Sequence, residues 1–139
     1  MKLAAHEART HFTKVPVVRL ATADDVGQPH VVATTFVVAD DLIFSAVDGK
    51  PKQSRNLKRL RNIQLNPRVS VLADHYEDDW TQLWWARADG TATVLEAEDD
   101  MAEPIRLLEE KYWQYRQDRP EGPVIAVTVD RWSGWVYAG

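Results

Sequence analysis

The stretch of this 139-residue chain best suited to binding chemistry is a basic segment, residues 50–61. It holds six of the seventeen Lys and Arg residues and no acid, although the whole chain carries a net charge of −4. The segment crosses from a Gly- and Pro-containing loop into a run with helical spacing of apolar residues. The first turn of a helix offers free N–H groups and the positive end of the helix dipole, so the junction suits a phosphate.

Within this segment, Ser54 would add a hydroxyl to the junction, and Lys52 and Arg55 would add two cations. The predicted helix begins at Ser54 and ends near Asn66, before Pro67. A solvated helix face with ordinary surface Lys and Arg residues would give the same pattern. The residues alone therefore leave a phosphate site and a plain surface helix as alternatives.

Tryptophan is unusually frequent, with six Trp against three Phe. Trp80, Trp84 and Trp85 fall in one strand-like run, and Trp132 and Trp135 fall in the last. Because side chains alternate along a strand, at least one Trp is expected off the core, at an interface or against a flat ring. Core packing is the alternative for the set and the preferred interpretation for Trp113.

Other candidates are weaker. Thr34 and Thr35 lie on a Val/Thr-rich strand, where one hydroxyl faces outward, but β propensity alone explains them. The acidic run 74–79 matches no calcium loop and no zinc motif, so a solvated turn is expected. The chain has no cysteine, which excludes disulfides and thiolate catalysis. No catalytic side chain and no metal site is predicted.

Composition favours one globular domain over residues 1–139, with 45% hydrophobic and 27% charged residues. The N-terminus does not resemble a signal peptide, and no run reaches the ~18 apolar residues of a membrane helix. We therefore expect a soluble, cytoplasmic protein without membrane contact. The negative net charge argues against nucleic acid as a partner.

The pattern of elements predicts a mainly β protein of six to seven strands with about three peripheral helices. Short connections indicate that the first three strands form an antiparallel meander. The expected strands cover residues 17–22, 30–38, 42–47, 69–73, 80–95, 124–129 and 132–138, and the expected helices cover residues 3–13, 54–66 and about 99–118. Asp89-Gly90 is predicted to be a bulge or turn.

The order of several motifs along nearly the whole chain resembles the pyridoxamine 5′-phosphate oxidase-like class. These motifs are Leu20-Ala21-Thr22, Gly27-Gln28-Pro29-His30, Leu42-Ile43-Phe44, Ser54-Arg55-Asn56-Leu57, Asn66-Pro67-Arg68-Val69-Ser70-Val71 and Asp89-Gly90-Thr91-Ala92. The segments 74–80 and 83–85 are similar to a subgroup of probable F420-dependent enzymes. The resemblance implies a split β-barrel homodimer with two cofactor sites at the subunit interface.

The resemblance also implies which residues bind the cofactor. Thr34, Thr35 and Ala46 would lie beside the ring system or its polyol chain, and Trp135 resembles a C-terminal tryptophan near the ring. Many members have a Lys where this chain has Gln53, and Lys52 would substitute for it. The residues expected to hold the phosphate and the nearby tail are Lys50, Lys52, Gln53, Ser54, Arg55 and Asn56.

The implied activity is hydride transfer between the deazaflavin F420 and a small organic substrate that the sequence does not identify. In such enzymes the cofactor carries the chemistry, and the protein supplies position and electrostatics. FMN in the same fold is the alternative cofactor, and a non-catalytic flavin- or deazaflavin-binding protein is the alternative function. Solvent, Tyr76 or His75 could supply a proton, and the sequence does not decide among them.

Overall fold

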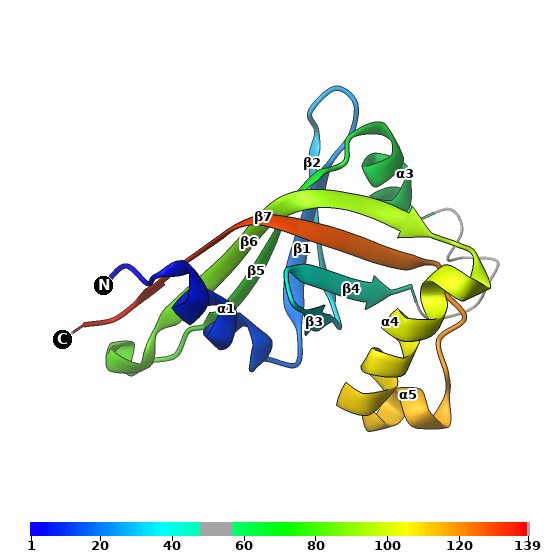
Figure 1. Cartoon of the computed structure of the whole chain (residues 1–139). Helices are drawn as coiled ribbons and strands as arrows, with labels where there is room; N and C mark the ends of the chain where they lie inside the picture. The colour runs from blue at the N-terminus through cyan, green and yellow to red at the C-terminus, as the bar shows by residue number, and fades with distance from the viewer. Residues whose placement is uncertain (48–56, 139) are drawn as a thin grey trace.

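The computed structural model describes residues 1–47 and 57–138. Seven strands form one antiparallel sheet, in the order β2-β1-β5-β6-β7-β4-β3, which coils strongly into an open barrel (Figure 1). The expected mainly β split barrel is confirmed. The strands are β1 (Val18–Ala23), β2 (Pro29–Thr34), β3 (Val37–Ala39), β4 (Leu42–Ala46), β5 (Arg68–His75), β6 (Trp84–Leu95) and β7 (Val124–Val136).

The described helices lie around this sheet. They are α1 (Ala5–Thr13), α3 (Lys58–Leu65), the short η1 (Trp80–Gln82), α4 (Glu98–Lys111) and α5 (Trp113–Gln117). The inner side of the sheet forms the main core with α1, whose Phe12 is fully buried and packs edge-on against Phe36 and Trp132. A second core lies between α4, α5 and β4, centred on Leu108. Two helices therefore close one end of the barrel as a separate layer (Figure 1).

The predicted strand 30–38 is two strands, so the expected three-strand meander is wrong. β2 pairs only with β1, and β3 pairs with β4 at the other edge of the sheet. Between them, the Tyr112 hydroxyl accepts from the Phe36 N–H at 3.0 Å and lies 2.9 Å from the Phe36 carbonyl. The Tyr112 side chain thus takes the place of the neighbouring-strand backbone that would otherwise pair with Phe36. Beyond this point the chain crosses from one edge of the sheet to the other.

Further boundaries differ from expectation. The single helix predicted over 99–118 breaks at Tyr112, which has an extended backbone, and Trp113 beyond the break is exposed rather than in the core. Trp80 lies in η1, not in the strand that begins at Trp84. The two predicted C-terminal strands are one strand, β7, because Arg131 continues the pairing with β6 beyond a bulge at which Asp130 has no partner.

The Asp89-Gly90 irregularity is confirmed as a register shift between β6 and β7. A Cβ atom added at Gly90 would lie 2.1 Å from the Thr128 carbonyl oxygen. Only glycine fits there, since the crowding atom belongs to the backbone.

Candidate functional site

The barrel is closed by side chains where its strands do not pair. β2 and β4 are not neighbours in the sheet, yet the hydroxyl oxygens of Thr34 and Ser45 lie 2.6 Å apart. Thr34 also donates to the Thr35 carbonyl oxygen at 3.1 Å. Because Thr34 has one hydroxyl proton, Ser45 must be the donor to Thr34.

A pocket of about 270 Å³ opens at this seam. We call it the seam pocket; its lining residues are Val17, Ala33, Thr34, Thr35, Ala46 and Arg59. They come from the start of β1, the end of β2, the end of β4 and the first turn of α3. The pocket therefore combines small apolar side chains, two hydroxyls and a guanidinium, a set that suits an anionic ligand with a flat or apolar portion.

The two helices at the barrel end hold the hydroxyl side of the seam pocket. Thr35 Oγ1 and the Tyr115 hydroxyl are 2.6 Å apart. The Tyr112 hydroxyl accepts a hydrogen bond from the N–H of Phe36, the residue after Thr35, and donates to the Pro16 carbonyl oxygen at 2.8 Å. Burial raises the pKa of Tyr112 to about 12, so its hydroxyl keeps its proton at neutral pH. The backbone that carries Thr34 and Thr35 is thus fixed from outside the sheet.

Lys111 lies beside Tyr112 and Phe36. Its Nζ is 3.5 Å from the centroid of the Phe36 ring, and burial lowers the pKa of Lys111 to about 8. The ring face offsets part of the lost hydration of the ammonium. Lys111 is accordingly a cation held in an apolar setting, against the ring of the residue that follows Thr35.

The structure brings some predicted site residues together and separates another. Thr34, Thr35 and Ala46 line the same pocket. Trp135 lies elsewhere, on β7, in register with Trp85 of β6 and bridged to Lys2. The predicted phosphate ligands Lys50, Lys52, Gln53, Ser54, Arg55 and Asn56 lie outside the described residues.

The sequence reasoning did not select Val17, Ala33 or Arg59 for the site. The sequence showed Arg59 only as one of several cations. With the helix expected to begin at Ser54, Arg59 was not expected in its first turn. α3 begins instead at Lys58, after an extended Leu57, so Arg59 belongs to its first turn. Leu60 and Ile63 are buried as the helical pattern predicted. Their burial orients α3 and leaves Arg59 at the pocket.

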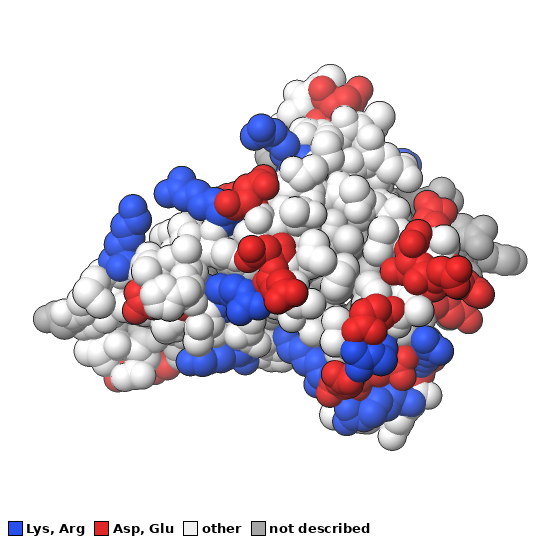
Figure 2. Space-filling view, in the orientation of Figure 1, with Lys and Arg blue, Asp and Glu red and all other residues white. Residues whose placement is uncertain are grey.

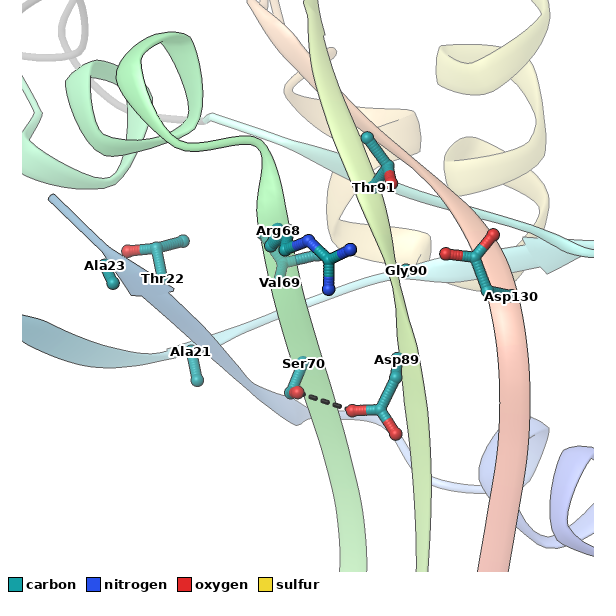
Figure 3. Close-up of a pocket in the computed structure, with 10 residues that line it drawn as sticks. All are labelled: Ala21, Thr22, Ala23, Arg68, Val69, Ser70, Asp89, Gly90, Thr91 and Asp130. Atoms are coloured by element: carbon teal, nitrogen blue, oxygen red, sulfur yellow. Dashed lines mark hydrogen bonds between the residues drawn. The ribbon is translucent and has the colours of Figure 1, made fainter. Parts of the chain in front are cut away.

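A second hollow of about 420 Å³ lies on the outer side of the sheet, over β1, β5, β6 and β7 (Figure 3). We call it the outer groove. Small residues, Ala21, Ala23, Ser70 and Gly90, form much of its surface, and the Arg68 side chain reaches across it. Ser70 donates to Asp89 at 2.6 Å, and Arg87 pairs with the same carboxylate at 3.2 Å.

Charge is unevenly spread over the described surface. Figure 2 shows acidic side chains gathered at the start of α4, where Glu98, Asp99 and Asp100 occupy the first turn. They stabilise that helix end through its dipole and would repel an anion. The first turn of α3 has no acid and carries Lys58, Arg59 and Arg61. An anionic ligand is therefore favoured at α3 rather than at α4.

The family model described as "Pyridoxamine 5'-phosphate oxidase" matches residues 4–136. Among solved structures, an FAD-binding protein from Mesorhizobium loti is 22% identical with a TM-score of 0.71, covering 96% of this chain and 95% of that one. An FAD-binding protein from Mycobacterium smegmatis is 19% identical with a TM-score of 0.69, covering 97% and 96%. The heme storage protein of Vibrio cholerae is 17% identical with a TM-score of 0.73, covering 94% and 92%.

These structural likenesses show a shared fold. None of the curated proteins compared with the chain matches it. Among the described residues, no helix is long and apolar enough to cross a membrane.

Proposed function

Because the chain belongs to the pyridoxamine 5′-phosphate oxidase family, we propose that it binds a phosphate-bearing flavin-type cofactor at the seam pocket and acts as an oxidoreductase that uses the deazaflavin F420. One observation carries the proposal. Thr34, Thr35 and Ala46, selected from the sequence by resemblance, line a single pocket together with a cation, Arg59. FAD-binding proteins of the same fold support a flavin-type ligand.

The residues of the seam pocket fit part of such a cofactor. A volume of about 270 Å³ is below the usual range for enclosing a whole drug-sized ligand, so the pocket would receive one portion and leave the rest along the surface. The Thr35 hydroxyl would bond a polar edge or the polyol chain, and Arg59 would pair with an anionic group. When bound, the deazaflavin supplies hydride transfer.

The protein's own contribution is position. Ser45 and Tyr115 hold the two threonine hydroxyls in place before a ligand arrives, and Tyr112 fixes the backbone between the strands. A site set in advance spends less binding energy on ordering its groups. Substrate would lie against the exposed side of the ring, where close approach of donor and acceptor supplies much of the rate.

F420 is proposed over FMN on grounds of charge. FMN ends in one phosphate, whereas F420 continues into a tail with several carboxylates. Lys58 and Arg61 extend the positive surface of α3 beyond Arg59, and both are exposed. Each exposed cation contributes roughly 0–1 kcal/mol, yet together they favour the ligand with more negative charge.

A homodimer is part of the proposal, since the family resemblance implies cofactor sites at a subunit interface. The outer side of the sheet carries the in-register pair Trp85 and Trp135, both only partly buried within one protomer. An obligate dimer commonly buries more than about 2,000 Å². We expect this side of the sheet to supply much of that area.

The test is a side-by-side titration of purified protein with FMN and with F420 at one ionic strength. Tighter binding of F420 is expected, and affinity for both ligands should fall as salt is raised. Changing Lys52 and Arg55 to Ala should weaken binding at least about 100-fold, on the order of 3 kcal/mol for two charge-assisted contacts. Tighter FMN binding would make a flavin-dependent reaction the leading function. Binding of neither ligand would overturn the proposal.

A further inference from the structure

The outer groove lies apart from the seam pocket and shares no lining residue with it. Its volume of about 420 Å³ falls within the range of small-molecule sites. Three of its polar side chains come from neighbouring strands, Arg68 from β5, Thr91 from β6 and Asp130 from β7 (Figure 3). The groove is therefore large and polar enough to hold a ligand of its own.

Two carboxylates line the outer groove, and one of them is already engaged. Asp89 accepts from the Ser70 hydroxyl at 2.6 Å. It also accepts from Nε of Arg87 at 3.2 Å, and Arg87 lies over the Trp85 ring. The charge of Asp89 is thus balanced by a side chain beside the groove. Asp130 is the carboxylate that remains to meet a ligand.

The outer groove presents two opposite charges, on Arg68 and Asp130. Within residues 1–47 and 57–138, the Arg68 guanidinium, the Asp130 carboxylate and the Thr91 hydroxyl make no hydrogen bond and no ion pair. All three residues are exposed. A ligand that pairs with them displaces water and breaks no contact within the protein. Both charges are therefore available to a ligand.

The strands keep these two charges apart. Asp130 is the extra residue of the β7 bulge beside Gly90, and such bulges re-aim a side chain. Arg68 pairs in register with Thr91 from the other side of β6. Because β6 lies between them, the backbones of β5 and β7 are roughly 10 Å apart. Gly90 has no side chain to fill this gap, and Figure 3 shows the Arg68 guanidinium reaching toward it from the β5 side.

We propose that the outer groove binds a small zwitterion, with its anionic group on Arg68 and its ammonium group on Asp130. The guanidinium fork suits a carboxylate, and the Asp130 carboxylate accepts from an ammonium. The Thr91 hydroxyl would add a bond to the anionic end. The ligand would carry no net charge, as the two partners together carry none. This inference goes beyond the proposed function, because it assigns a second ligand to a second site.

The preference for two charges on one molecule distinguishes this site from a general anion site. A single exposed ion pair contributes little, so a ligand with one charge should bind weakly. Two such contacts reinforce each other when one molecule makes both, because the second forms within the complex. A zwitterion should therefore bind more tightly than a molecule of similar length that carries either charge alone.

An NMR titration of isotope-labelled, cofactor-free protein tests this preference. The probes are glycine, γ-aminobutyrate and ε-aminocaproate, whose two charges lie at increasing separation, while butyrate and butylamine supply each charge alone. At least one zwitterion should bind about threefold or more tightly than both single-charge probes, with an affinity that falls as salt is raised. The backbone amide signals that shift should be those of groove residues, including Ser70, Gly90 and Thr91.

Neutral variants identify which end of the ligand meets which residue. Arg68→Gln should weaken zwitterion and butyrate binding about threefold or more and leave butylamine binding unchanged. Asp130→Asn should weaken zwitterion and butylamine binding by a similar factor and leave butyrate binding unchanged. The control Arg19→Gln removes an exposed cation of β1 that does not line the groove, and it should alter none of these affinities. Circular dichroism shows whether each variant is folded.

The inference is overturned if no zwitterion binds the unchanged chain more tightly than both butyrate and butylamine. It is also overturned if the shifted signals belong to the seam pocket, or if the folded Arg68→Gln and Asp130→Asn proteins bind the zwitterion as the unchanged chain does. The FMN and F420 titration addresses the seam pocket and is a separate measurement. Failure of both cofactors to bind leaves the zwitterion site standing, and failure of the zwitterions leaves the proposed function standing.

Discussion

The hydroxyl oxygens of Thr34 and Ser45, 2.6 Å apart, join β2 to β4 across a barrel seam at which no ladder forms. Ser45 is buried, and Thr34 lines the seam pocket. The same contact therefore closes the fold and borders the candidate ligand site. Opening the seam would cost stability and would also alter the pocket.

Thr34→Val should destabilise the fold by about 1–3 kcal/mol, because it removes the hydrogen bond and leaves the buried Ser45 hydroxyl without this partner. The double variant Thr34→Val with Ser45→Ala should cost less than the sum of the single changes. Urea denaturation of all four proteins measures the coupling. Additive costs would mean that the hydroxyl pair does not hold the seam.

Lys111 should make stability depend on alkaline pH. Its folded-state pKa of about 8 lies below the ordinary value of 10.5, so the unfolded chain binds more protons between these values. The contribution of Lys111 to stability is therefore complete above about pH 10.5 and is lost as pH falls through about 8. Lys111→Met should be more stable than the unchanged chain at pH 7, and the difference should shrink by pH 10.

Denaturant unfolding at pH 7 and pH 10 checks this expectation. Lys14→Met, at an exposed lysine beyond α1, serves as the control and should show no such change between the two pH values. An advantage of Lys111→Met that stays constant with pH would show that packing, rather than charge, produces it.

Arg59→Gln should weaken FMN binding by about tenfold, since one charge-assisted contact is worth roughly 1.5 kcal/mol. The loss should be smaller at high salt, where the charged contact is screened. Arg119→Gln removes a cation from a surface pair with Glu109 and should bind as the unchanged chain does. Isothermal titration at two salt concentrations compares the three proteins, and equal affinities would remove Arg59 from the site.

Gly90→Ala should destabilise the fold by about 3 kcal/mol, because the added methyl meets the Thr128 carbonyl oxygen at 2.1 Å and the backbone must shift. The neighbouring Thr91→Ala, at an exposed position, should cost less than about 1 kcal/mol. Thermal unfolding followed by circular dichroism ranks the two. Similar midpoints would show that the bulge adapts to a side chain.

Local pattern predicted most of the elements, because apolar spacing and Pro or Gly punctuation act within a few residues. The burial of Leu60 and Ile63 and the bulge at Gly90 followed from such signals. The break at Phe36 could not, since its cause is Tyr112, far along the chain. Trp113 was wrongly expected in the core because the break at Tyr112 changes which way the following helix faces.

The site was predicted in part for the same reason. Thr34, Thr35 and Ala46 meet at the seam pocket, but the side chains that orient the two threonines come from β4 and α5. No spacing rule links Thr35 to Tyr115, because only the folded chain brings them together. F420, the dimer and the roles of residues 50–56 remain predictions.

The bulge at Gly90 also lies where the partners of β6 change, and a bulge bends its strand locally. On the N-terminal side of the bulge, β6 lies between β5 and the half of β7 that does not pair with β4. On the C-terminal side, β6 pairs with the half of β7 that also pairs with β4. Gly90 therefore marks the position along β6 at which its neighbours change, where an added side chain would meet the backbone of β7. A methyl group at Gly90 would therefore disturb the pairing of β6 with both of its neighbouring strands at once.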